Sequence, residues 1–136
     1  MPPSAPDYGR SLKGLGFNLI VKNVPAAVKF AVQVLEAEVY FQTAAFAAMK
    51  LNGAAFMFHA DETYQNNPLF GSLAEARGVG VELRAYDLDP DLAEARARSG
   101  GWTVLSGAID KPHGLREAMI LDDDGYVWIP AVQLKS

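Results

Sequence analysis

Residues 17–25, Phe17-Asn-Leu-Ile-Val-Lys-Asn-Val-Pro25, predict a strand that leads directly into a helix. Leu19 and Val21 alternate with polar neighbours, which is the two-residue period of a strand with unlike faces. Asn23 is a favoured residue at a helix start, and a proline in the first turn is tolerated because its missing N–H has no helical partner. Apolar residues then recur at helical spacing, so we expect a helix over about 24–36.

Three short apolar stretches follow this helix and complete a first structural unit. They lie at about 38–43, 46–51 and 54–59. Asn52-Gly53 separates the last two stretches and is a strong signal for a two-residue β-hairpin turn. The first part of the chain therefore predicts one strand, one helix and three further strands.

The same pattern begins again after a polar stretch. Residues 61–77 are predicted to form a connector, with room for a short helix around 69–76. Gly80–Tyr86 has the alternation of a strand, and Asp87-Leu-Asp-Pro90 opens a helix that runs to about Ser99. Three more strands are predicted, at Trp102–Ser106, Leu115–Leu121 and Tyr126–Val132.

Matching marks in the two halves indicate an internal duplication. Asn23-Val24 and Asp87-Leu88 each join a first strand to a helix and lie 64 positions apart, whereas the hairpin glycines Gly53 and Gly125 lie 72 apart. The second copy is thus eight residues longer between these marks, and the turn-rich stretch Gly107–Gly114 has that length. Order, spacing and turn chemistry agree, so we interpret the chain as a duplicated βαβββ unit.

The chain of 136 residues is long enough for one domain with one core. We expect an α+β fold with a first module at about 14–60, a connector at 61–77 and a second module at about 78–134. The first dozen residues are rich in proline and serine, and we expect them to be frayed.

Composition and charge exclude several classes of partner and chemistry. Sixteen Asp and Glu residues outnumber 12 Lys and Arg residues, so the chain lacks the basic field that nucleic-acid binding needs. The absence of cysteine rules out disulfides, thiolate nucleophiles and cysteine-ligated metals. No apolar stretch has the length of a membrane span, and the N-terminus lacks the apolar core of a signal peptide. We therefore expect a cytoplasmic protein with no membrane or nucleic-acid partner.

Two stretches carry a resemblance to a known superfamily. They are Asn18-Leu-Ile-Val-Lys-Asn-Val-Pro-Ala-Ala-Val-Lys-Phe30 and His113-Gly-Leu-Arg-Glu-Ala-Met-Ile-Leu-Asp-Asp-Asp-Gly125. Within a duplicated βαβββ unit they resemble the vicinal oxygen chelate superfamily, which includes glyoxalase I, extradiol dioxygenases and bleomycin-resistance proteins. With Gly80–Asp89, the resemblance covers most of residues 14–134. It implies an open, eight-stranded, barrel-like cup with helices outside and a small-molecule ligand inside, and it implies a homodimer.

The positions of the superfamily's metal ligands carry no suitable donor in this chain. By resemblance, two ligands lie seven residues before the Asn or Asp that ends each opening strand, at Gly16 and Gly80. The other two lie four residues after the hairpin glycines, at Met57 and Ile129. None of these side chains binds a hard divalent cation. We therefore predict no metal cofactor, and a closer likeness to the metal-free, bleomycin-resistance-like branch.

Strand alternation predicts which side chains point into the cup. Residues on one face should pack against the helices: Leu19, Val21, Val81, Leu83, Ala85 and Trp128. Residues predicted to contact the ligand are Asn18, Met57, His59, Glu82, Arg84, Tyr86 and Glu117. Of the neighbours Arg116 and Glu117, only one can face inward, and the sequence leaves the choice open.

Some of these residues have two interpretations. Glu82 and Arg84, two positions apart on one strand face, either orient a ligand or form an ion pair with each other. His59 is either a histidine at the rim of the cup or a member of a displaced metal site with Glu82 and Glu117 or His113.

The predicted function is metal-independent binding of a small aromatic or amphipathic organic molecule, with no catalytic residue assigned. One alternative is a metal-dependent, glyoxalase-like lyase, isomerase or dioxygenase whose metal ligands are displaced. Another is an interaction domain with an empty cup. The fold does not choose among them, because one scaffold can host unrelated activities.

Overall fold

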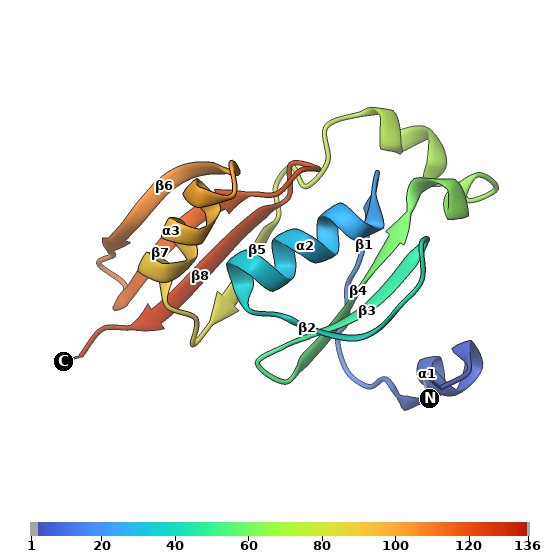
Figure 1. Cartoon of the computed structure of the whole chain (residues 1–136), viewed down its shortest axis with the longest axis horizontal. Coiled ribbons are helices and arrows are strands. Elements are labelled where there is room, and N and C mark those ends of the chain that lie inside the picture. The colour runs from blue at the N-terminus through green and yellow to red at the C-terminus, as the bar shows by residue number, and fades with distance from the viewer. Residues whose placement is uncertain (1–2, 136) are drawn as a thin grey trace.

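The computed structural model describes residues 3–135 as two four-stranded sheets, each with a helix against one side (Figure 1). The first sheet has the strand order β1–β4–β3–β2 and the second β5–β8–β7–β6. In each sheet the first strand runs parallel to the fourth, and the other pairs are antiparallel. The strands are β1 (Asn18–Val21), β2 (Glu38–Gln42), β3 (Phe46–Leu51), β4 (Ala54–Ala60), β5 (Glu82–Tyr86), β6 (Thr103–Asp110), β7 (Leu115–Leu121) and β8 (Val127–Gln133).

The helices complete two βαβββ units and confirm the predicted α+β class. They are α1 (Ala5–Ser11), α2 (Val24–Leu35) and α3 (Pro90–Ser99), with short 3₁₀ helices η1 (Asp61–Tyr64) and η2 (Phe70–Ala74) in the connector. Over residues 3–135 the two sheets stay separate and do not close into a barrel. Within the same residues, no helix is both long enough and apolar enough to cross a bilayer.

The starts of α2 and α3 correct the spacing between the two units. Asn23 caps α2, and its side chain accepts a hydrogen bond from the backbone N–H of Ala26. The equivalent cap of α3 is Asp89, which lies 66 positions later, and not Asp87. Asp87 instead adopts a left-handed conformation (φ 60°) in a turn after β5, so two further residues precede the helix.

The strand registers agree with this corrected spacing. In the first sheet, Asn18 of β1 pairs with Met57 of β4. In the second sheet, Arg84 of β5 pairs with Ile129 of β8. Equivalent residues of β1 and β5 are therefore 66 positions apart, and equivalent residues of β4 and β8 are 72 positions apart. Arg84 is the structural counterpart of Asn18.

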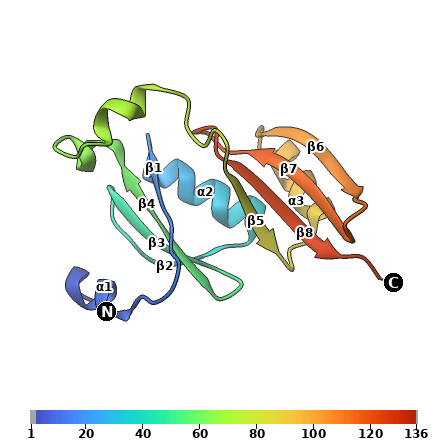
Figure 2. The ribbon, with the colours of Figure 1, turned by 180° about the vertical axis from the view of Figure 1, so that it is seen from behind.

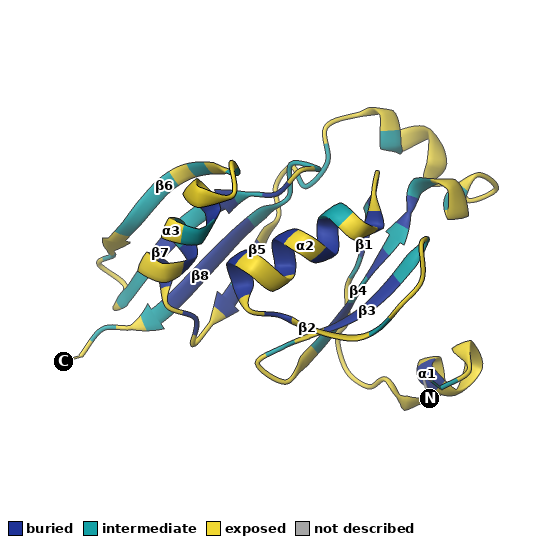
Figure 3. Cartoon of the chain, viewed as in Figure 1, coloured by how far each residue is buried: buried dark blue, intermediate teal, exposed yellow. Residues whose placement is uncertain are grey.

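An apolar core lies between the sheets and the helices α2 and α3. Phe30 of α2 is 1% exposed, and its ring centroid lies 5.3 Å from that of Trp102 and 6.5 Å from that of Trp128. Trp128 is therefore on the helix side of its sheet, as predicted. Buried segments run along α2, α3 and the strands beside them (Figure 3). The core cluster includes four residues that were predicted to pack against the helices: Leu19, Val21, Leu83 and Ala85. We call the opposite side of each sheet, away from α2 and α3, its open face (Figure 2).

Three local predictions were wrong. Val81 is half exposed, because it lies before the start of β5 and not within the strand. β6 continues to Asp110, so the first half of the stretch 107–114 is strand; irregular pairing with β7 accommodates the extra residues. Residues 5–11 are not frayed but form α1, whereas residues 1–2 lie outside the described part of the chain.

Arg77 ties the connector to both units. Its guanidinium donates two hydrogen bonds to the carboxylate of Asp61, at 2.8 and 2.6 Å, and one to the carbonyl of Ile20, at 3.1 Å. The same group lies 3.6 Å from the carboxylate of Asp124, in the turn between β7 and β8. The Arg77 side chain is only 6% exposed, so these contacts hold a charge that is largely removed from water.

Candidate functional site

The N-terminal segment, residues 5–17, crosses the open face of the first sheet. Tyr8 is the buried residue of α1, and its ring centroid lies 5.3 Å from that of Phe41 on β2 and 6.4 Å from that of Phe46 on β3. Phe46 pairs with His59 of β4. The neighbours of His59 along β4 are buried towards α2, so Phe46 and His59 belong to the open face. α1 therefore covers part of this face.

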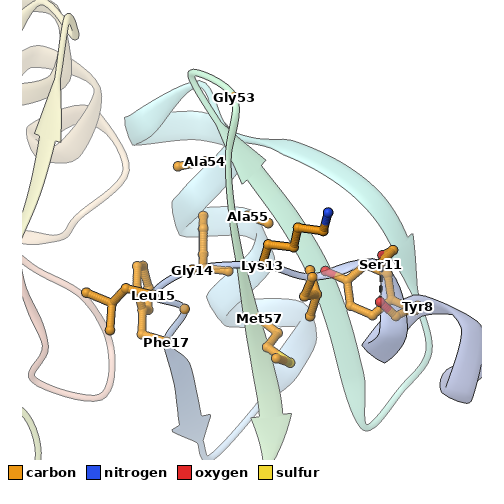
Figure 4. Close-up of a pocket in the computed structure, with 13 residues that line it drawn as sticks. Tyr8, Ser11, Lys13, Gly14, Leu15, Phe17, Gly53, Ala54, Ala55 and Met57 are labelled. Atoms are coloured by element: carbon orange, nitrogen blue, oxygen red, sulfur yellow. Dashed lines mark hydrogen bonds between the residues drawn. The ribbon is translucent and has the colours of Figure 1, made fainter.

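Two cavities flank the segment. The first, of about 440 Å³, lies between α1 and the sheet, and its walls include Tyr8, Phe41, Phe46 and His59. The second, of about 570 Å³, lies beneath residues 11–17 and the start of β4 (Figure 4). Both cavities include Tyr8, Leu12 and Met57 in their walls, so they are two sides of one groove that the N-terminal segment bridges.

His59 is a polar residue in the wall of the smaller cavity and is held by side-chain hydrogen bonds. Its Nδ1 lies 2.6 Å from Oδ1 of Asn18, and Nδ2 of Asn18 donates a 2.7 Å hydrogen bond to the hydroxyl of Tyr64 in η1. The imidazole also packs edge-on against Phe46 and Tyr64, with ring centroids 4.7 and 5.9 Å away. Partial burial lowers the pKa of His59 below its ordinary value of 6.5, so the ring is neutral at pH 7.

A second polar cluster occupies the open face of the second sheet. Arg84 donates a hydrogen bond to Oε1 of Glu82 at 3.0 Å, one to the hydroxyl of Tyr86 at 3.1 Å, and one to Glu117. Nε2 of His113 lies 3.3 Å from the Glu117 carboxylate, and Glu117 is buried. The guanidinium therefore has protein acceptors on every side, which is the mutual ion pair that the sequence left as one interpretation.

The predicted ligand contacts thus fall into two groups. Asn18, Met57 and His59 lie together on the first sheet. The others, Glu82, Arg84, Tyr86 and Glu117, lie together on the second. The choice between Arg116 and Glu117 is also settled, because Arg116 pairs with Asp91 on α3 at 2.8 Å and so faces the helix side.

Four aromatic residues of the site were absent from the predicted ligand contacts: Tyr8, Phe41, Phe46 and Tyr64. Tyr8 was missed because its helix was missed. A signal for its helix was present, because Ser4 is a favoured capping residue and its hydroxyl accepts a hydrogen bond from the backbone N–H of Asp7. Pro6 also suits the first turn of a helix. Ser4 and Pro6 therefore indicate the start of a helix, and the prediction of a frayed segment was wrong.

The residues present do not fit a metal site of the superfamily's kind. With Asp89 as the true helix cap, the second-module position moves from Gly80 to Glu82, because the ligand lies seven residues before the cap. Glu82 is a possible donor, but its carboxylate already accepts a hydrogen bond from Arg84. The other three positions, Gly16, Met57 and Ile129, offer no oxygen or nitrogen side-chain donor. No group of three or more potential metal-binding side chains occurs within residues 3–135.

Solved structures share this fold across most of the chain. A glyoxalase/bleomycin resistance protein/dioxygenase family enzyme from Burkholderia phytofirmans PsJN aligns with a TM-score of 0.73 and 17% identity, over 88% of this chain and 97% of that one. A glyoxalase-related enzyme from Fulvimarina pelagi gives 0.73 and 18%, over 90% and 89%. TioX from Micromonospora sp. ML1 gives 0.64 and 18%, over 91% and 98%. The chain therefore has the glyoxalase/bleomycin-resistance fold that the resemblance implied.

Sequence comparison adds no closer relative. A scan against protein-family models and a search of the curated proteins find no match. Function must therefore be argued from the site itself.

Proposed function

We propose that the protein binds a small organic molecule on the open face of the first sheet, without a metal ion. The observation that carries the proposal is the 440 Å³ cavity between α1 and the sheet, where His59 lies among aromatic side chains. This volume is within the range of small-molecule pockets. Aromatic walls favour the burial of a ring, and one well-placed polar group fixes the orientation of that ring.

The polar cluster on the second sheet offers less to a ligand. Arg84 is already bound by Glu82, Tyr86 and Glu117, so a ligand would have to displace one of these acceptors. We therefore assign the binding role to the first sheet, and we assign no catalytic residue.

A binding assay with a matched pair of variants tests this proposal. Small aromatic probes such as indole, quinoline and 2-methoxynaphthalene are titrated into ¹⁵N-labelled protein that has been treated with a chelator. At least one probe should saturate and shift the resonances of His59 and Phe46. Phe46→Ala removes an aromatic wall and should weaken binding about tenfold or more, because a buried aromatic contact of this size contributes about 1.5 kcal/mol or more.

The control is Phe70→Ala, which truncates an exposed phenylalanine of the connector and should leave affinity unchanged. Binding that appears only after Mn²⁺, Fe²⁺, Ni²⁺ or Zn²⁺ is added would favour the metal-dependent alternative. Shifts confined to the second sheet would place the ligand elsewhere.

We also propose that two copies of the chain associate through the open face of the second sheet. Tyr86 and Ile109 are both about half exposed there, which leaves apolar surface beside the Arg84 cluster. Light scattering should report a dimer for the natural chain and a monomer for Ile109→Glu. Leu92→Glu, a matched change at an exposed site on α3, should remain a dimer. A monomeric natural chain would contradict the proposal.

A further inference from the structure

The hydrogen bonds around His59 fix which of its two nitrogens carries the proton. Asn18 uses its amide nitrogen to donate to Tyr64, so its carbonyl oxygen is the atom that faces His59. A carbonyl oxygen can only accept a hydrogen bond, so Nδ1 of His59 must be the donor. A neutral imidazole carries one proton, and Nε2 therefore presents a lone pair.

Nε2 of His59 is open to a ligand. Within residues 3–135 its ring makes one hydrogen bond, through Nδ1 to Asn18. No fully buried side-chain nitrogen or oxygen in that part of the chain lacks a hydrogen-bond partner, so Nε2 of His59 keeps some exposure to solvent. His59 is a wall residue of the cavity, so Nε2 is the hydrogen-bond acceptor that this side chain can offer to an occupant.

The other walls of the cavity restrict the charge of its occupant. They are formed by the rings of Tyr8, Phe41 and Phe46, by Leu12, Thr43 and Met57, and by Ala5 and Gly9 of α1. None of the described wall residues is charged. A charged group would lose its hydration there without gaining a counter-ion, which is strongly unfavourable.

We propose that the ligand is a neutral, planar aromatic molecule that donates a hydrogen bond, from a phenolic O–H or a ring N–H, to Nε2 of His59. This inference rests on the proposed binding function and names the ligand class of the same site. His59 contacts the ligand directly, and Asn18 acts as a positioning residue that holds the acceptor nitrogen towards the cavity.

Two probes that differ in one donor test the inference. 2-Naphthol carries an O–H, whereas 2-methoxynaphthalene has the same rings and no donor. The natural chain should bind 2-naphthol roughly three- to tenfold more tightly at pH 7.5, as expected for one net hydrogen bond. His59→Phe keeps a ring in place and should bring this ratio close to one.

Asn18→Ala tests the positioning role, because it frees the tautomer of His59. Long-range ¹H–¹⁵N spectra of the natural chain should show Nδ1 protonated and Nε2 unprotonated, and the variant should show a proton on Nε2 and a reduced probe ratio. Asn66→Ala, an exposed asparagine of the connector, should change neither measurement. The ratio in the natural chain should also fall at acid pH, where imidazolium donates from Nε2 and no longer accepts.

The outcomes separate the two proposals. If both probes bind the cavity equally, the donor class is wrong and the binding function stands. If neither probe nor any ring in the wider panel binds, the binding function fails, and the ligand class fails with it. A proton on Nε2 in the natural chain at pH 7.5 overturns the inference without any ligand.

Discussion

Asp122 is a single buried carboxylate that is expected to make the free energy of unfolding depend on pH. It lies in the turn between β7 and β8, where it accepts hydrogen bonds at 3.0 Å from the backbone N–H groups of Asp124 and Tyr126 and from Nε1 of Trp128. Burial outweighs these bonds and raises the pKa of Asp122 from 3.8 to about 6. The folded protein therefore takes up a proton at Asp122 more readily than the unfolded chain does.

The sign of the effect on stability follows from this difference. As the pH rises from about 4 to about 6, the unfolded chain loses the Asp122 proton first, and the free energy of unfolding falls by up to about 3 kcal/mol. Above pH 6 this contribution is constant. Asp122→Asn should abolish it, and should also lower stability at every pH because an amide N–H would then face the N–H of Trp128. Urea unfolding at pH 4.5 and 7.5 measures both effects.

The control for this experiment is Asp123→Asn, which removes an exposed carboxylate of the same turn and leaves Asp122 in place. Equal pH slopes for the natural chain and for Asp122→Asn would contradict the assignment.

At the level of elements, α1 is attached to the molecule by one side chain. Tyr8 is its buried residue, and the chain that follows contains Gly14 in a left-handed conformation (φ 77°) and a fully exposed Leu15. Tyr8→Ala should release α1, so that amide hydrogen exchange at residues 5–11 becomes roughly tenfold faster or more. The midpoint of global unfolding should stay close to that of the natural chain, since the main core lies on the other side of the sheet.

Tyr8→Phe is the matched variant, because it keeps the ring between Phe41 and Phe46 and should preserve slow exchange. Slow exchange in Tyr8→Ala would show that other contacts hold α1 in place.

Periodicity predicted most elements of this fold, because their burial pattern is local. The strand at β1, the helix α2 and the hairpin at Asn52-Gly53 follow from spacing and turn chemistry alone. The predicted end of β6 was four residues too early, because Gly107 and Asp110 are residues typical of turns. These residues belong to the strand because β6 pairs with β7, which the local sequence does not reveal. α1 was missed because its start was marked by a cap and not by an apolar period.

At the level of the whole molecule, Arg77 is predicted to carry much of the stability that joins the two units. Arg77→Met leaves the Asp61 carboxylate without its partner and Asp124 without a nearby cation. Breaking a buried ion pair in this way should lower the free energy of unfolding by about 3–5 kcal/mol. Chemical denaturation monitored by tryptophan fluorescence measures the change.

Arg96→Met provides the comparison, since Arg96 pairs with Glu36 at 2.8 Å on the surface. That variant should lose at most about 1 kcal/mol. Equal losses in the two variants would show that Arg77 does not act as a buried clamp.

The site was harder to predict than the fold, because it depends on contacts between distant residues. Asn18 and His59 were each predicted to face the ligand, but their hydrogen bond spans 41 positions and follows from the parallel pairing of β1 with β4. Glu82 and Arg84 were assigned to the right face, but their pairing with Glu117 depends on β5, β7 and β8 together. Residue type and alternation predict on which face of a sheet a side chain lies. Contacts with distant residues decide which of these side chains remain free to bind a ligand.

The correspondence between the two halves has a consequence for binding stoichiometry. The offsets of 66 and 72 positions make Arg84 the counterpart of Asn18 and Ala131 the counterpart of His59. The second half therefore has a methyl group where the first has an imidazole, so the repeat of the backbone does not extend to the side chains of the proposed binding site. For the site proposed on the first sheet we expect one molecule of ligand per chain, and a ligand with twofold symmetry of its own gains nothing from the two repeated units.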